Sequence, residues 1–222
     1  VAESARNVSC VGALPVAITN NLNFASPETE IGYWQLSTAC EGISIACEAL
    51  ETPVTGGNVS LYNESIDEEG NKKPIQPTPV IGMVGVLDNV KQAVSSGWKN
   101  INDEIWIIGS KDSGLTLGAT SYLEYFHGQI TGRPPSLNLI DEKLCQLFIR
   151  NGILNNLIIS SHDISDGGLA IALAEACILS DKGASINLIA DKRIDSLLFS
   201  EGGSRIIFSI SHMKKNEWLK FV

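Results

Sequence analysis

Several patterns are missing from this sequence of 222 residues, and each absence excludes a class of function. No apolar run reaches the ~18 residues that a membrane-spanning helix needs, and no basic, apolar leader opens the chain. Lys and Arg number 16 against 25 Asp and Glu, and the formal net charge is −9. Because no basic cluster is present, a nucleic-acid backbone would be repelled. We therefore expect no membrane partner and no nucleic-acid partner, and a soluble protein of the cytoplasm.

Cysteine is sparse, and its spacing argues against disulfides. The five Cys are odd in number and form no CxxC pair. Cys40 and Cys47 lie two helical turns apart, ~10 Å along a helix axis, whereas a disulfide needs Cα atoms within ~7 Å. We predict reduced, buried, structural cysteines in a reducing compartment. Cys and His together provide no metal-ligand set, and no GxxxxGK[ST] phosphate loop occurs.

The apolar pattern predicts alternating strands and helices, which is typical of α/β or α+β layers. The clearest helix is 34–50, where apolar residues repeat at the three-and-four spacing of one buried face. That face consists of Leu36, Ala39, Cys40, Ile43, Ala46, Cys47 and Leu50. Further helices are expected from residue 1 to near Gly12 and over 120–128, 139–151 and 169–179. Strands are expected over 16–19, 80–87 (buried), 104–109, 156–161, 185–190 and 204–211, with a polar loop after the first.

Two segments break this pattern. Residues 65–79 are charged and rich in Pro, and we expect an exposed excursion there. The pattern weakens over 88–103, which we interpret as a domain boundary. The helix at the start has neither a Met nor an N-cap before it, so we expect a truncated chain or a gene fragment.

The stretch "TPVTGGNVSLYNE", residues 52–64, has the composition of a loop that approaches a ligand. Two adjacent Gly, Gly56 and Gly57, remove side chains that would block a phosphate. Oxygen ligands and hydrogen-bonding groups follow at Asn58, Ser60, Asn63 and Glu64. A plain strand-to-strand turn stabilised by Asn and Ser explains the same composition, and the residues alone leave both interpretations open.

Two further stretches carry Gly pairs: "HDISDGG" (162–168), which precedes a helix, and "SEGGSR" (200–205), which precedes a strand. A helix N-terminus offers free N–H groups and a partial positive charge. Asp163 and Asp166 either cap this helix or hold a cation. His162 is either a general base or a hydrogen-bonded residue at the end of a strand.

The order of several stretches resembles a known family. "AESARNVSCVGALPVAITNNLNFASPE", "YWQL", "TPVTGGNVSLYNE", "PTPVIGMVG", "HGQITGRPP" and "HDISDGGLAIALAEA" are similar to the large subunit of phosphoribosylformylglycinamidine synthase in its shorter bacterial form. The resemblance covers essentially all 222 residues. This superfamily also includes aminoimidazole ribonucleotide synthetase, selenophosphate synthetase and thiamine-monophosphate kinase, which bind ATP without a Walker loop.

The resemblance implies a fold. The family chain is a tandem of two halves, each with an N-terminal domain whose strands join a shared barrel and a layered C-terminal α/β domain. This sequence looks like the second half without its opening strands. We therefore expect an incomplete synthetase-like N-terminal domain over 1–90 and the C-terminal α/β domain over 91–222.

The resemblance also implies a function in purine biosynthesis. The family, a class of ligase, uses ATP to activate the formamide oxygen of formylglycinamide ribonucleotide, and ammonia then displaces phosphate to give the amidine. The implied cofactors are ATP and Mg²⁺. The implied partners are the small-molecule substrate, a glutaminase subunit that supplies ammonia from glutamine, a small accessory subunit, and the first half of the same chain.

Four site residues carry over from the family motifs. Asn20 stands where the family has a nucleotide-contacting Asp, so one charge is lost. Gly57 matches the glycine that contacts ATP, Asn58 the Mg²⁺-binding Asn, and Ser60 the Ser that contacts substrate. The family's catalytic His lies in the first half, so no catalytic residue is expected among these 222 and the chain alone should be inactive.

The stretches around His162, Asp163 and Glu201 match an auxiliary site, which in larger members of the family keeps a structural nucleotide. We expect no catalytic role for these three residues. Two alternatives remain open: a non-catalytic scaffold half that binds a structural nucleotide, and another ATP-using member of the superfamily. The second alternative needs acidic metal-binding strands at the N-terminus, which this chain lacks.

Overall fold

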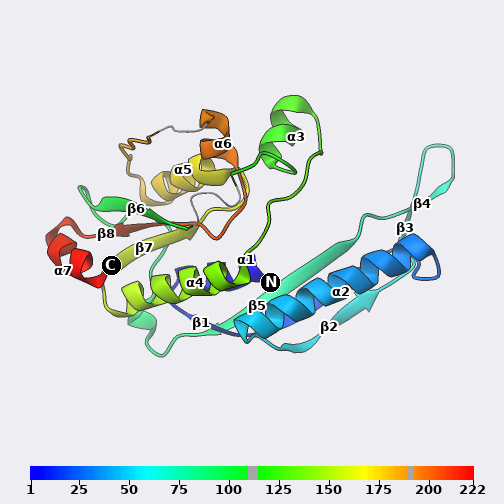
Figure 1. Ribbon diagram of the computed structural model, residues 1–222, viewed down its shortest axis with the longest axis horizontal. Helices are drawn as coiled ribbons and strands as arrows, with labels where there is room; N and C mark the ends of the chain where they lie inside the picture. The colour runs from blue at the N-terminus through cyan, green and yellow to red at the C-terminus, as the bar shows by residue number, and fades with distance from the viewer. Residues whose placement is uncertain (110–114, 190–192) are drawn as a thin grey trace. The chain divides into compact units, whose positions relative to one another are not determined.

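The computed structural model describes residues 1–109, 115–189 and 193–222, and it contains two compact units, each with its own sheet (Figure 1). The first unit consists of Val1–Ala5 and Pro15–Val86, and the second of Arg6–Leu14 and Leu87–Val222. Helix α1 (Ala2–Cys10) therefore begins in the first unit and ends in the second.

The first unit is built on a three-stranded sheet in the order β2-β1-β5. The strands are β1 (Leu14–Asn23), β2 (Val54–Ser60) and β5 (Thr78–Val86), and β1 and β2 run parallel. Helix α2 (Glu30–Leu50) connects β1 to β2 and runs along the sheet in Figure 1. Along β1, buried Ile18 and Leu22 alternate with exposed Thr19 and Asn21. Because successive side chains of a strand point to opposite faces, β1 has one buried and one exposed face, whereas every residue of β2 except Ser60 is exposed.

Helix α2 has clear start and stop signals. The Thr29 hydroxyl accepts a hydrogen bond from the Gly32 N–H, and Glu51 closes the helix in the left-handed conformation. Ala46, Cys47 and Leu50 of the predicted face are buried, and Leu36, Ala39 and Ile43 are half-buried. Cys40 is exposed, so the prediction that this thiol is buried is wrong; the apolar face of α2 is fully buried only near its C-terminal end.

Two predictions for the first unit are corrected. Residues 54–60 form strand β2 instead of a loop, and the polar residues 20–23 belong to β1. Polar side chains are compatible with both strands because the ladder bonds come from the backbone and one face is exposed. Strand β5 lies near the predicted place but is not buried: only Ile81 and Met83 are even half-buried.

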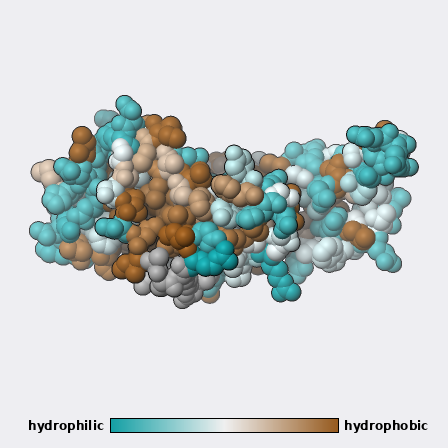
Figure 2. Space-filling model, turned by 90° about the horizontal axis from the view of Figure 1, so that it is seen from above, coloured by the Kyte–Doolittle hydropathy of each residue, from teal (hydrophilic) through white to brown (hydrophobic). Residues whose placement is uncertain are grey.

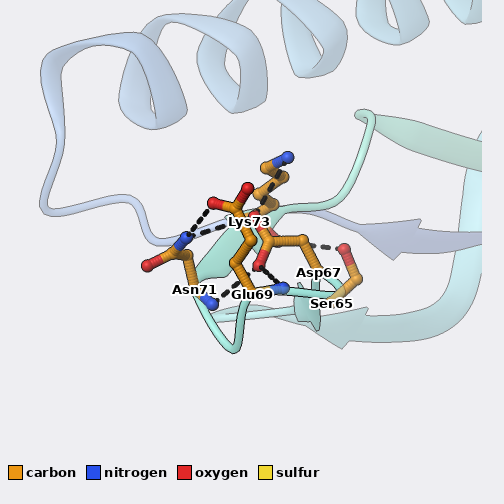
Figure 3. Close-up of polar contacts among 5 residues, drawn as sticks. All are labelled: Ser65, Asp67, Glu69, Asn71 and Lys73. Atoms are coloured by element: carbon orange, nitrogen blue, oxygen red, sulfur yellow. Dashed lines mark hydrogen bonds and ion pairs between the residues drawn. The ribbon is translucent and has the colours of Figure 1, made fainter.

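The exposed excursion predicted over 65–79 is confirmed, and it contains an antiparallel hairpin of β3 (Glu64–Ile66) and β4 (Lys72–Pro74). Figure 3 shows Asp67 at its centre, where the carboxylate accepts from the Asn71 N–H at 2.8 Å and pairs with Lys73 Nζ at 3.1 Å. The hydrogen bond from Asn71, followed by that from Lys73, lowers the pKa of Asp67. The hairpin end is mostly hydrophilic (Figure 2, right). Local polar bonds, not a core, therefore order this hairpin.

The second unit is a layered α/β structure. Its sheet has the order β6-β8-β7, with both pairs antiparallel. The strands are β6 (Glu104–Ile108), β7 (Ile158–Asp163) and β8 (Ile206–Ile210). The helices are α3 (Ser121–His127), α4 (Leu139–Leu154), α5 (Gly168–Ser180), α6 (Ile194–Phe199) and α7 (Lys215–Phe221).

The central strand β8 supplies both cores of this unit. Ile206, Phe208 and Ile210 pack into a cluster with the apolar faces of α4 and α7, which include Ile149. Ile207 points the other way, into a cluster with α5. All five residues of β8 are buried, so helices cover both faces of the sheet, and the strand expected over 204–211 is confirmed.

Other differences are local. The described part of the strand predicted at 185–190, residues 185–189, forms no strand; residue 190 lies outside the described residues. Helices α6 and α7 are not predicted. No helix in the described part of the chain is long and apolar enough to cross a membrane.

The cysteines are free thiols, as expected. Cys10, Cys47 and Cys145 are buried, Cys177 is half-buried and Cys40 is exposed. Burial raises the pKa of Cys10 and of Cys145 to about 12. These two thiols therefore stay protonated and unreactive at neutral pH.

Candidate functional site

The pairing of β1 with β2 brings the four predicted site residues onto neighbouring strands. In this parallel register Asn20 lies opposite Gly57, Asn21 opposite Asn58, and Asn23 opposite Ser60. Segments about 37 positions apart in the sequence are thus joined by six pairs, of which the five from Thr19 to Asn23 are consecutive; the register shifts between Ile18 and Thr19.

The four residues divide between two faces of the sheet. Asn20 and Gly57 share the face of buried Ile18, whereas Asn58 and Ser60 share the exposed face, because paired residues project to the same side and neighbours alternate. A single ligand that contacts both pairs has to pass the outer edge of β2, which is an edge strand among the described residues.

The two adjacent glycines differ in what surrounds them. A Cβ atom on Gly57 would lie 2.0 Å from Asn20 Oδ1 and 2.2 Å from the Asn20 carbonyl oxygen, whereas a Cβ on Gly56 would meet nothing within 4 Å. Asn20 therefore requires a glycine at position 57. Only Gly56 leaves free space above the strand, and its carbonyl oxygen accepts from the Thr19 hydroxyl at 3.1 Å.

On the exposed face, two amides form a cross-strand hydrogen bond. Asn58 Nδ2 donates to Asn21 Oδ1 at 3.3 Å. This bond engages the Asn58 nitrogen and leaves its oxygen for a ligand. The sequence reasoning missed Asn21 and Asn23 as members of this face; their period-two spacing in "NNLN" is the signal that could have found them.

The donors on this face are neutral. The described residues contain no group of three or more His, Cys, Asp or Glu placed to hold a metal ion. Mg²⁺ prefers oxygen ligands and keeps several waters, and in nucleotide sites phosphate oxygens supply part of its shell. Asn58 Oδ1 therefore fits an ion already held by phosphates, and the set does not fit a bare ion.

The stretch "HDISDGG" (162–168) forms a cluster of polar side chains in the second unit. His162 Nε2 lies 3.0 Å from Glu175 Oε2, and His162 Nδ1 lies 3.4 Å from Asp163 Oδ1. The hydrogen bond to Asp163 raises the pKa of His162, and partial burial opposes the rise. Asp163 is itself buried, and its Oδ2 has no hydrogen-bond partner among the residues that the structure describes. This His is thus engaged by two carboxylates.

We predict that His162 makes the stability of the chain dependent on pH. A histidine with a raised pKa in the folded state stabilises it fully below the unfolded value near 6.5, and this contribution is lost as pH rises through the folded pKa. Urea unfolding of wild type and His162→Gln at pH 5.5, 7 and 8.5 tests this. The stability difference in favour of wild type should shrink as pH rises, and a constant difference would contradict the prediction.

The "SEGGSR" stretch is bound to two helix starts. Glu201 Oε1 accepts from the Ser121 N–H of α3 and from the Gly167 N–H before α5, both at 2.8 Å. The Arg205 guanidinium, which is buried, donates to the Ser200 carbonyl at 2.6 Å and to the Gly202 carbonyl at 2.9 Å. Two of the N–H groups that could face a phosphate are thus already used by the chain's own carboxylate.

The fold and the order of motifs match one family of proteins. The family model of the AIR synthase related protein N-terminal domain matches residues 1–87, and that of the AIR synthase related protein C-terminal domain matches residues 100–220. The chain belongs to the AIR synthase related proteins.

Several relatives of high identity carry one name. "Phosphoribosylformylglycinamidine synthase subunit PurL" from Prochlorococcus marinus strain AS9601 is 71% identical over all of this chain, and that from strain MIT 9215 is 70% identical. The chain spans 29% of the length of these relatives.

Solved structures of low identity share the fold. Thermotoga maritima PurL complexed with ATP aligns with 99% of this chain and 33% of its own, at a TM-score of 0.63 and 18% identity. PurL from that organism complexed with FGAR covers 99% of this chain and 35% of its own, at 0.64 and 18%. The PurLQS structure from Thermotoga maritima covers 97% and 33%, at 0.66 and 21%.

Proposed function

We propose that this chain is part of a phosphoribosylformylglycinamidine synthase, a ligase that uses ATP to convert formylglycinamide ribonucleotide and ammonia into the amidine. The observation that carries this proposal is the 71% identity, along the whole chain, to a relative of that name. Structures of more distant PurL proteins with ATP and with FGAR support the choice of both ligands.

The geometry of β1 and β2 supports roles for the carried-over residues. Asn58 presents its amide oxygen on the exposed face, where it would add one ligand to Mg²⁺ held by ATP. Ser60 lies two positions further along the same face and would contact the substrate. Asn20 packs over Gly57 and shapes the opposite face, where the nucleotide contact is proposed. When bound, ATP supplies the phosphoryl group that activates the formamide oxygen, and Mg²⁺ offsets the charge of its phosphates.

The wider setting is also a proposal. The domains would meet near residues 88–103, with 1–90 as the N-terminal and 91–222 as the C-terminal domain. The partners would be a glutaminase subunit, a small accessory subunit and the remaining length of a longer synthase chain, in the cytoplasm. The PurLQS structure from Thermotoga maritima is the assembly for comparison.

The test of this proposal is turnover with and without the rest of the synthase chain. We expect no amidine from these 222 residues with formylglycinamide ribonucleotide, ATP and ammonia, because the catalytic His implied by the family lies elsewhere. The complete chain that contains them should form the amidine. Product from the 222 residues alone, above a buffer blank, would contradict the proposal that the catalytic His lies outside them. No product from the complete chain would overturn the proposed function.

A scaffold that only holds a structural nucleotide is the second candidate. The auxiliary stretches around Asp163 and Glu201 raise it, but Glu201 already occupies two backbone N–H groups there. This candidate predicts nucleotide that co-purifies with the chain and is not hydrolysed.

Asn58→Ala in the complete chain should raise the Mg²⁺ concentration needed at fixed ATP. The substitution removes one of few protein ligands, while a surface Asn costs within ~0.5 kcal/mol of stability. Titration of Mg²⁺ in wild type and variant, with thermal melts alongside, measures both effects. Asn71→Ala, in the exposed hairpin, is the matched control. Superimposable Mg²⁺ curves for wild type and Asn58→Ala would remove Asn58 from the metal site.

A further inference from the structure

The end of β2 is held by one side chain, that of Asn63. Asn63 Nδ2 donates to the Ser60 carbonyl oxygen at 2.8 Å and to the Phe24 carbonyl oxygen at 3.3 Å. The Asn63 backbone N–H also donates to the Phe24 carbonyl, at 3.1 Å. Tyr62, with φ of 59°, makes the tight turn that brings Asn63 back toward the strand.

These contacts decide which way the Asn63 amide points. Carbonyl oxygens only accept hydrogen bonds, so the NH₂ group has to face both of them. In a flipped amide, Asn63 Oδ1 would face the carbonyl oxygens of Ser60 and Phe24 with no hydrogen between them. The Asn63 oxygen therefore faces the Ser60 hydroxyl, with Oγ and Oδ1 3.2 Å apart.

The orientation of Asn63 in turn decides the chemistry of Ser60. A serine hydroxyl has one hydrogen and two lone pairs, and an amide oxygen can only accept. Ser60 must donate its one hydrogen to Asn63 Oδ1. What remains for a ligand at this half-buried hydroxyl is lone pairs alone.

We propose that Asn63 is a positioning residue that makes Ser60 an acceptor-only contact, so that the group of formylglycinamide ribonucleotide that meets Ser60 is an N–H or O–H donor and not a phosphate oxygen. This inference rests on the proposed function and adds to it which partner donates the hydrogen bond between Ser60 and the substrate. The substrate has both kinds of donor, an amide N–H and ribose hydroxyls, whereas its phosphate oxygens are acceptors at neutral pH. Ser60 would therefore accept a hydrogen bond from the amide or the ribose part of the substrate.

The experiment is a double-mutant cycle in the complete synthase chain, with KM for formylglycinamide ribonucleotide, KM for ATP and thermal stability measured for each protein. Ser60→Ala should raise KM for the ribonucleotide about 3- to 10-fold, the size of one neutral hydrogen bond. Asn63→Leu should raise the same KM similarly, because the freed hydroxyl turns away. In the Ser60→Ala background, Asn63→Leu should raise it no further. Asn71→Leu is the control and should leave KM unchanged.

Two more measurements keep the inference open to refutation if Asn63→Leu folds poorly. Asn63→Asp keeps an acceptor oxygen for Ser60 and loses the amide donors, so it should lower thermal stability and keep KM near the wild-type value. Ser60→Ala, which removes one exposed-face hydroxyl, should leave the inhibition constant of inorganic phosphate unchanged.

The outcomes separate this inference from the proposed function. Additive changes in KM, an Asn63→Asp variant as impaired as Asn63→Leu, or weaker inhibition by phosphate in Ser60→Ala would each overturn the inference. If wild type uses formylglycinamide ribonucleotide and Ser60→Ala alone raises KM, the proposed function stands without the role of Asn63. If wild type does not use this substrate, the proposed function itself fails.

Discussion

Gly57→Ala is expected to destabilise the first unit by about 1–3 kcal/mol, the usual cost of overpacking, and to disturb the pairing of β1 with β2. The new methyl group would lie 2.0 Å from Asn20 Oδ1 and 2.2 Å from the Asn20 carbonyl oxygen. The side-chain oxygen can rotate away, but the carbonyl oxygen belongs to the strand backbone. The two strands must therefore separate at the pair of Asn20 with Gly57, next to the site residues Asn58 and Ser60 of β2.

The neighbouring glycine is the matched control for this prediction. Gly56→Ala adds the same methyl group where nothing lies within 4 Å, and it should leave stability unchanged or raise it by up to about 1 kcal/mol, since Gly is unfavourable in a strand. Urea unfolding followed by circular dichroism measures the stability, and hydrogen exchange of the β1 and β2 amides locates the change. Equal stabilities for the two variants would refute the close packing of Asn20 on Gly57.

The helices of the second unit could be predicted from the sequence because their signals are local. The apolar spacing over 139–151 and 169–179 identifies α4 and α5, which the structure extends by a few residues to Leu139–Leu154 and Gly168–Ser180. Asn138 caps α4 through its side-chain oxygen. Periodicity and caps depend only on residues within a few turns, so no tertiary information is needed.

The strands of the first unit were harder to predict because burial decides their pattern. The polar residues 20–23 suggest a loop, although they belong to a strand, with Asn21 and Asn23 on its exposed face and Asn20 on the other. Strand β5 is apolar and yet mostly exposed, and an apolar run by itself suggests burial. In both cases the pattern describes side chains, whereas the ladder bonds that define the strand come from the backbone.

The candidate site shows the same limit. The residue types at 56–60 and the resemblance together pointed to Asn58 and Ser60. Their partner Asn21 and their separation from Asn20 by the sheet depend on the register of β1 with β2. That register joins segments on either side of α2, and local spacing carries no information about it.

Arg6→Met is expected to destabilise the chain by about 3–5 kcal/mol, because it leaves a buried carboxylate without its cation. Arg6 Nη1 lies 3.4 Å from Glu142 Oε2, and the Arg6 and Glu142 side chains are 9% and 0% exposed. Arg6 also donates to the Gly203 carbonyl at 3.1 Å, and Gln146 Nε2 donates to Glu142 Oε1 at 2.9 Å. The pair therefore joins α1 to α4 and to the loop before β8.

The double variant Arg6→Met with Glu142→Met shows whether the cost comes from the unpaired charge. Apolar side chains of similar length remove both charges together, and replacing a whole buried pair is often neutral or stabilising. The double variant should therefore recover most of the stability lost in Arg6→Met. Lys72→Met breaks the exposed pair with Glu64, where the side chains are 75% and 36% exposed, and it should change nothing measurable. Urea unfolding of all three proteins provides the comparison, and a double variant no more stable than Arg6→Met would show that packing at Arg6, not charge, holds α1 against α4.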